Sequence, residues 1–164
     1  MSNPANTKPK AEAPTRTNEQ KWTATLMDAG WTVVPDVIIE RQQALGLDAI
    51  DVNIIMHLAI RWWQPENKPH PSKGTIAAAM GVDARTVQRR IAALEAHGLI
   101  RRVERRVSPT GSKSNIYELD GLIKHATPFA KEKIEERKAK EAAAKAKAKK
   151  RGPAKLRVVG GDED

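Results

Sequence analysis

Residues 71–119 read PSKGTIAAAMGVDARTVQRRIAALEAHGLIRRVERRVSPTGSKSNIYEL. Apolar residues recur at helical spacing in the first part of this stretch, and turn-forming residues separate two apolar and basic runs in the last part. The pattern predicts a short helix, a tight turn, a longer basic helix and a β-hairpin.

Residues with a preference for helix ends mark the limits of both predicted helices. Ser72 is suited to cap the first helix, Gly81 closes it, and Asp83 is suited to cap the second. The second helix runs to about His97 and is stopped by Gly98. Two helices joined by so short a turn are typical of a helix-turn-helix, and the following hairpin is expected to be its wing.

The second helix has two different faces. Val87, Ile91 and Leu94 fall on one side, whereas Arg85 and Arg89 point to the opposite side. One face can therefore pack on a core while the other stays free to enter a groove of DNA.

The rest of the chain divides around this stretch. A long core helix is expected over residues 48–63, with Asp48 as its cap, and the prolines of residues 64–71 end it. The predicted zones are a disordered tail (1–20), a lead-in strand and helix (21–47), a winged helix-turn-helix domain (48–126) and a basic tail rich in Ala and Lys, helical or disordered (127–164). Within the lead-in, we expect a strand at 31–35 and a helix at 35–46. The fold class is mainly α with a small β-hairpin, with a polar, basic C-terminal helix or tail.

Composition narrows the function. The chain of 164 residues contains no cysteine, which excludes disulfides and thiolate metal sites. Neither a signal-peptide core nor an apolar run of membrane-spanning length is present, so we expect a cytoplasmic, nucleoid-associated protein without a membrane partner. A net charge of +9 favours a polyanionic partner, although many basic proteins owe such a charge only to solvated tails. In this chain the positive excess is shared between residues 48–126 and the segment from Lys131 onward, so neither part alone explains it.

The sequence gives little support to catalysis. The four histidines are scattered without metal-ligand spacing, and no phosphate-binding loop or nucleophile motif occurs. We therefore expect neither enzymatic activity nor a cofactor, a metal or a small-molecule ligand. Trp62 and Trp63 can offer stacking platforms for single-stranded nucleic acid, or they can pack against Trp31 or the hairpin.

The candidate DNA-binding side chains come from three places, and each set has a simpler alternative. Those of the second helix can read bases or touch phosphates, or can be merely solvated. Those of the hairpin can follow a phosphate backbone, or can protect an edge strand. Those at the start of the first helix can bind a phosphate, or can only cap the helix. The three sets are Arg85, Thr86, Gln88, Arg89 and Arg90 in the second helix; Arg105, Arg106 and Lys113 in the hairpin; and Ser72, Lys73 and Thr75 in the first helix.

Residues 75–102, TIAAAMGVDARTVQRRIAALEAHGLIRR, resemble the helix-turn-helix core of winged-helix bacterial regulators of the GntR and MarR type. The positions that carry the resemblance are Thr86, Val87, Arg89, Leu94, Gly98, Leu99 and Ile100. With the preceding residues, roughly 31–126 also resemble the helix-turn-helix domains of phage and plasmid proteins, including replication initiators. The chain lacks the effector domain of GntR proteins and the long apolar dimer helices of MarR proteins, so the resemblance implies neither ligand response nor dimerisation.

Our interpretation of the sequence is a protein that binds double-stranded DNA in a sequence-specific way, as a bacterial or mobile-element transcriptional regulator. A plasmid or phage replication or partition accessory is the alternative within DNA binding. From a different class, a protein-interaction or RNA-binding winged helix remains open, as does a homodimer.

Overall fold

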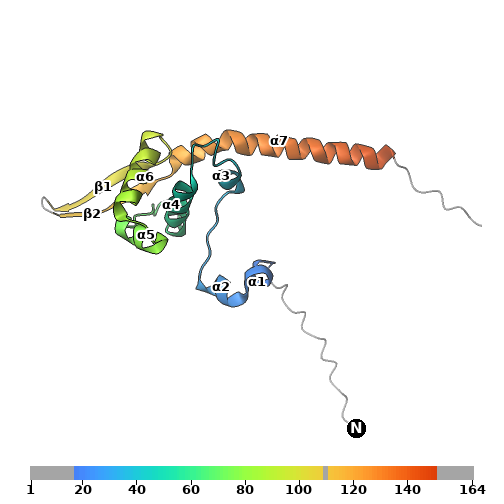
Figure 1. The fold of residues 1–164 in the computed structure, drawn as a ribbon. Coiled ribbons are helices and arrows are strands. Elements are labelled where there is room, and N and C mark those ends of the chain that lie inside the picture. The colour runs from blue at the N-terminus through green and yellow to red at the C-terminus, as the bar shows by residue number, and fades with distance from the viewer. Residues whose placement is uncertain (1–16, 109–110, 151–164) are drawn as a thin grey trace, which may run out of the picture.

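The computed structural model describes residues 17–108 and 111–150. In these residues the chain forms helices and one antiparallel hairpin, which projects from the helical part (Figure 1). The elements in order are α1 (Thr17–Trp22), α2 (Ala24–Ala29), α3 (Asp36–Glu40), α4 (Ala49–Ile60), α5 (Lys73–Met80), α6 (Ala84–Ala96), β1 (Arg101–Ser108), β2 (Gly111–Glu118) and α7 (Asp120–Lys150). The fold is a winged helix-turn-helix, as the sequence predicts: α5 and α6 are the helix pair, and β1 and β2 are the wing.

Side chains from α3, α4, α5, α6, β2 and α7 meet in one core. The stripe of α4 contributes Ile54, Ile55 and Leu58, all buried, and α6 contributes its predicted apolar face. Tyr117 of the wing is 1% exposed, and burial raises the pKa of its hydroxyl. Leu122 at the start of α7 completes the packing. The core therefore joins the helix-turn-helix, the wing and α7 into a single unit.

The predicted caps form. Asp48 accepts hydrogen bonds from the backbone N–H groups of Ile50 and Asp51, and the Asp51 carboxylate accepts one from the Asp48 N–H, which makes a capping box. Ser72 caps α5 and Asp83 caps α6. Between them Gly81 ends α5 with φ of 67°, a left-handed conformation that suits glycine.

The wing is fastened to the loop that precedes α5. The backbone N–H of Tyr117 donates to the Pro69 carbonyl at 2.8 Å, and the Ser114 hydroxyl donates to the His70 carbonyl at 2.7 Å. Across the hairpin, Arg105 lies opposite Lys113 in the strand register. The loop 64–71, which the sequence identifies only as a helix terminator, thus also positions the wing.

The helix α7 is longer than the sequence predicts. We expected the domain to end at residue 126 and a separate tail to begin at residue 127, but one helix runs from Asp120 through Pro128 to Lys150. Proline cannot donate the backbone hydrogen bond of a helix interior. Packing on both sides of it compensates: Leu122 and Ala126 are buried before Pro128, and Phe129 packs against the core after it.

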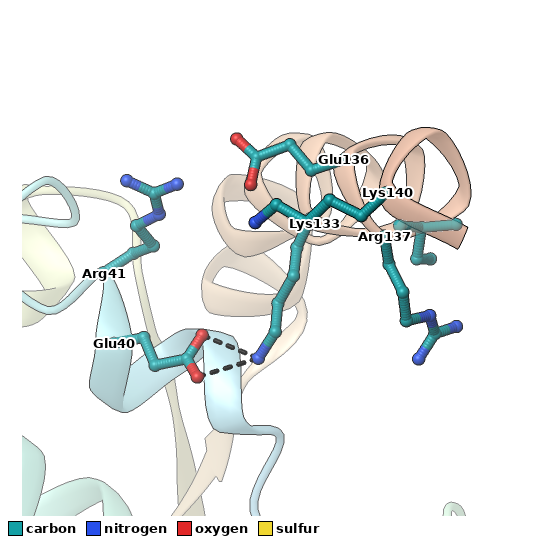
Figure 2. Close-up of a pocket in the computed structure, with 7 residues that line it drawn as sticks. Glu40, Arg41, Lys133, Glu136, Arg137 and Lys140 are labelled. Atoms are coloured by element: carbon teal, nitrogen blue, oxygen red, sulfur yellow. Dashed lines mark hydrogen bonds and ion pairs between the residues drawn. The ribbon is translucent and has the colours of Figure 1, made fainter. Parts of the chain in front are cut away.

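A close contact fixes where α7 begins. A Cβ atom on Gly121 would lie 2.0 Å from the Gly98 carbonyl oxygen, so only glycine fits there. The neighbouring Leu122 N–H donates to the Leu99 carbonyl at 2.6 Å. Further along α7, Lys133 donates to both carboxylate oxygens of Glu40 in α3 (Figure 2). The helix is thus held at its start and again near its middle.

The lead-in differs most from expectation. Residues 31–35 form no strand, because no strand lies beside them to supply a backbone partner. The helix expected over 35–46 ends at Glu40 and continues as turns, which still bury Leu45. Residues 17–20, predicted as part of a disordered tail, belong to α1. The rest of that tail, residues 1–16, and residues 151–164 lie outside the described residues.

Among the residues that the structure describes, no helix is both long and apolar enough to cross a membrane.

Candidate nucleic-acid interface

The outer face of α6 is basic and accessible. Arg85, Gln88 and Arg89 are exposed and Thr86 is half-buried, and together with Asp83 they line a shallow surface hollow of about 400 Å³. Within the described part of the chain, no acidic side chain pairs with Arg85 or Arg89. Both guanidinium groups are therefore free to meet an anionic or hydrogen-bonding partner.

The start of α5 lies beside this face. The Lys73 ammonium donates to the Gln88 side-chain oxygen at 3.1 Å, which links α5 to α6 at the surface. The Ser72 hydroxyl accepts from the Thr75 N–H at 3.0 Å, so this serine caps the helix as the simpler interpretation requires. Whether Ser72 and Thr75 also contact a phosphate stays a prediction.

Arg90 has a different environment from its neighbours. Its guanidinium donates to the Asp51 carboxylate, with Nε to Oδ1 at 2.8 Å, and also pairs with Asp48 at 2.5 Å. Hydrogen bonding to Asp51 raises the pKa of Arg90. Burial opposes ionisation of Asp48, but the Asp51 backbone N–H and the Arg90 charge hold its pKa below the usual value. Arg90 thus joins α6 to the start of α4, and the phosphate contact considered for it remains untested.

The wing side chains differ in how free they are. Arg105 is half-buried and donates to the backbone carbonyl of Ser114 at 3.0 Å, across the hairpin. Lys113 is exposed. The side chain of Arg106, which we also predicted to contact DNA, lies outside the described part of the structure. Lys113 is therefore the most available of the described wing cations.

Sequence reasoning missed two ion pairs of the wing, one that joins it to α6 and one between its two strands. Arg102 donates through Nε to Glu95 at 2.6 Å, and this hydrogen bond lowers the pKa of the Glu95 carboxyl. At the base of the hairpin, Arg101 donates to Glu118 at 2.7 Å. The Arg101–Glu118 pair could have been predicted from the opposite charges at the two ends of the predicted hairpin. Glu95, in contrast, has the sequence context of an ordinary solvated helix residue.

The described residues contain no group of three or more His, Asp or Glu side chains placed to hold a metal ion. Of the two tryptophans considered for stacking, Trp62 is half-buried with the Lys68 ammonium 5.0 Å from its ring centre, and Trp63 is exposed. Trp62, Trp63 and Trp31 line one groove, on a part of the surface separate from the α6 hollow.

The fold and this face define the class of protein as a winged helix-turn-helix, and comparisons with known proteins agree. A family model described as a helix-turn-helix domain matches residues 45–100. That match covers α4 to α6 and supports DNA binding by these helices.

Two solved structures are similar to the chain. One is the N-terminal domain of DnaD protein from Geobacillus kaustophilus HTA426, with 17% identity and a TM-score of 0.50 over 73% of this chain and 96% of that one. The other is the transcriptional regulator PA3341, with 19% identity and a TM-score of 0.36 over 83% of this chain and 98% of that one. No curated protein sequence matches the chain. At 17% identity, the similarity to the DnaD domain concerns the fold alone.

Proposed function

We propose that this protein binds double-stranded DNA in a sequence-specific way, with α6 in the major groove. The observation that carries the proposal is the outer face of α6, where Arg85 and Arg89 are exposed and unpaired among the described residues while Val87, Ile91 and Leu94 anchor the other side in the core. A helix held rigidly on one side and basic on the other is the element that helix-turn-helix proteins place in the groove.

The side chains of this face suit base recognition. An arginine can donate two hydrogen bonds to guanine, and a glutamine can make two with adenine, so Arg85, Arg89 and Gln88 are the base-reading candidates. Lys73 can hold the Gln88 amide in one orientation through their hydrogen bond. A preset amide loses less entropy on binding than a free one.

Phosphate contacts surround the reading face in this proposal. Thr86, Ser72, Lys73 and Thr75 lie at the starts of α6 and α5, where free backbone N–H groups favour anions. Lys113 and Arg106 of the wing would follow the flanking backbone, and Arg105 would hold the hairpin. Arg90 is a positioning residue here, because its guanidinium is bonded to Asp51.

We further propose that this binding regulates transcription in a bacterium or a mobile element, and that the protein is not an enzyme. A role as an accessory in replication or partition is the alternative. The resemblance of residues 75–102 to regulators favours the first role. Selection of bound fragments from the source genome distinguishes the roles, since promoters or a replication origin would be enriched.

A gel shift with matched duplex DNA, single-stranded DNA and RNA tests the proposal. We expect tighter binding to duplex DNA, and among random duplexes a subset that resists competition by bulk DNA. A preference for RNA or single strands, or binding to none of the three, would contradict it and would favour the RNA-binding or protein-interaction alternatives.

A further inference from the structure

Large apolar side chains are exposed in two places outside the outer face of α6: on the helices α1 and α2, and on residues 31–33 and the end of α4. Trp22, Leu26, Trp31 and Val33 are between 55% and 71% exposed, and Ile60 and Trp63 at the end of α4 are 42% and 69% exposed. Single apolar residues are normal on a protein surface, but a cluster such as Trp31, Val33, Ile60 and Trp63, which line one groove, marks an interaction site.

The second of these places forms a groove. Trp31, Thr32 and Val33 line one side, and residues 59–60 and 62–63 at the end of α4 line the other. Its volume is about 340 Å³. The Nε1 of Trp62 is buried beside it without a hydrogen-bond partner among the described residues. The groove is thus open, aromatic and poor in polar groups.

The N-terminal arm, residues 17–30, directly precedes the groove-lining residues 31–33 and lacks a core of its own. Its helices α1 and α2 have six residues each and bury no side chain among residues 18–31. Figure 1 shows them apart from the rest of the domain, joined to α3 by an extended segment. Helices so short are not stable alone in water, so packing against another surface would stabilise them.

The few charged residues near the groove indicate what kind of partner it binds. Residues 22–34 contain one charged side chain, Asp28, and residues 59–63 contain one, Arg61. Both are exposed, and neither has a partner within the described part of the chain. Two copies with a net charge of +9 repel each other, and a face with few charges, where an exposed acid can meet an exposed base, is where they can associate.

We propose that the chain forms a homodimer by exchanging its N-terminal arms. The arm of one copy packs Trp22 and Leu26 into the groove of the other, and Asp28 of each copy pairs with Arg61 of its neighbour. Two-fold symmetry forms every contact twice. The association does not require DNA. A single strand of nucleic acid suits the groove less well, because Arg61 and Lys68 are the cations placed beside it among the described residues, and Lys68 already pairs with Asp120.

Sedimentation of the full-length protein over a wide concentration range, without DNA, tests this proposal. The parent should pass from monomer to dimer with rising concentration, with a blue shift of tryptophan emission as the indoles leave water. Leu26→Glu should raise the dissociation constant at least about tenfold, as expected for a residue at the centre of an interface. The matched control Ile123→Glu, at a residue 48% exposed on α7, should leave it unchanged.

A charge exchange tests the pairing itself. Asp28→Arg and Arg61→Asp should each weaken the dimer, and the double variant should restore it, which general damage to folding would not do. A parent that stays monomeric at every concentration, an effect of Leu26→Glu no larger than that of Ile123→Glu, or a double variant no stronger than the singles would overturn the proposal. So would a monomeric parent whose tryptophan emission is quenched by a single-stranded oligonucleotide, because the groove would then be a stacking site.

Discussion

Asp51 shows how one residue can position the reading helix. It lies three positions before Ile54 on the buried stripe of α4 and is 2% exposed. A carboxylate among buried isoleucines needs a partner, and Arg90 of α6 supplies it. Arg90 directly follows Arg89. The Asp51–Arg90 ion pair therefore fixes the rotation of α6 next to its outer face.

Asp51→Asn should therefore lower stability and weaken DNA binding together. Removing one partner of a buried ion pair costs up to about 3 kcal/mol, towards the low end of the usual range because Arg90 keeps Asp48. Urea denaturation gives the decrease in stability, with the exposed carboxylate variant Glu136→Gln as the control. An Asp51→Asn midpoint equal to that of the parent would show that the pair does not hold α6.

The lowered pKa of Glu95 should make the stability of the fold depend on pH. Its pKa is lowered from 4.5 by the hydrogen bond from Arg102, so the folded state releases this proton more readily than the unfolded state. The resulting stabilisation is present above pH 4.5 and is lost as the pH falls through the lower folded value. Glu95→Gln removes it, so the stability difference between the parent and Glu95→Gln should be constant near neutrality and shrink in acid. A difference that is the same at all pH values would refute this role.

At this scale the sequence predicted the outer face of α6 but not the partners of single charges. Asp51 carried a signal, since it interrupts an apolar stripe, yet its partner lies 39 positions away. Nothing local in the sequence relates two residues so far apart. The contacts of Lys73 with Gln88 and of Arg102 with Glu95 were hidden for the same reason.

At the scale of elements, α6 depends on its buried face. Leu94 is 1% exposed in the core near the end of the helix. Leu94→Ala should cost about 2 to 5 kcal/mol, because it reduces apolar burial and leaves a cavity. Thermal or urea denaturation measures this, and Ile123→Ala, at a half-exposed position, should cost much less. A melting temperature close to that of the parent would contradict the packing of α6.

The elements that the sequence predicted well are those with caps and a clear period. Residues 48–119 have both, because Asp48, Ser72, Gly81 and Asp83 mark the ends of helices whose buried residues recur at spacings of about three and four. The lead-in strand was wrong because WTVVP has strand-like composition, while strand formation needs a neighbour that the fold does not supply there. The continuity of α7 was missed because Pro128 is a helix breaker in sequence, and only tertiary packing overrides it.

At the scale of the whole molecule, the length of α7 places the lysines near its end far from the basic outer face of α6. The helix leaves the domain on the side opposite the wing tip (Figure 1), and its 31 residues span about 46 Å at the α-helical rise. Its contacts with α3 end near Lys133, while Lys145, Lys147 and Lys149 lie exposed beyond them. This far part has no apolar stripe to pack, so its positive charge is available to phosphates.

Removal of residues 139–164 should weaken binding to all duplexes alike. This cut keeps the contacts of α7 with α3, and the salt slope of log affinity should fall by about 0.9 for every phosphate that the shortened chain no longer neutralises. The measurement is a salt series on two DNA sequences, and full-length protein with Lys145, Lys147 and Lys149 changed to Gln serves as a second variant. An unchanged slope would mean that the far part of α7 has no DNA partner, and a changed ratio of the two affinities would mean that it also reads sequence.

The central claim is that α6 reads duplex DNA through its outer face, and Arg89→Ala tests it most directly. Affinities of the parent and of Arg89→Ala are measured for the best duplex from a selection and for a scrambled duplex at the same salt. Arg137→Ala on α7 removes the same charge away from α6 and is the control. Without its two hydrogen bonds to a base, the variant should bind the selected duplex about 1 to 3 kcal/mol more weakly and prefer it less over the scrambled duplex, while the control keeps that preference. If Arg89→Ala binds the selected duplex as tightly as the parent does, α6 does not read DNA with this face.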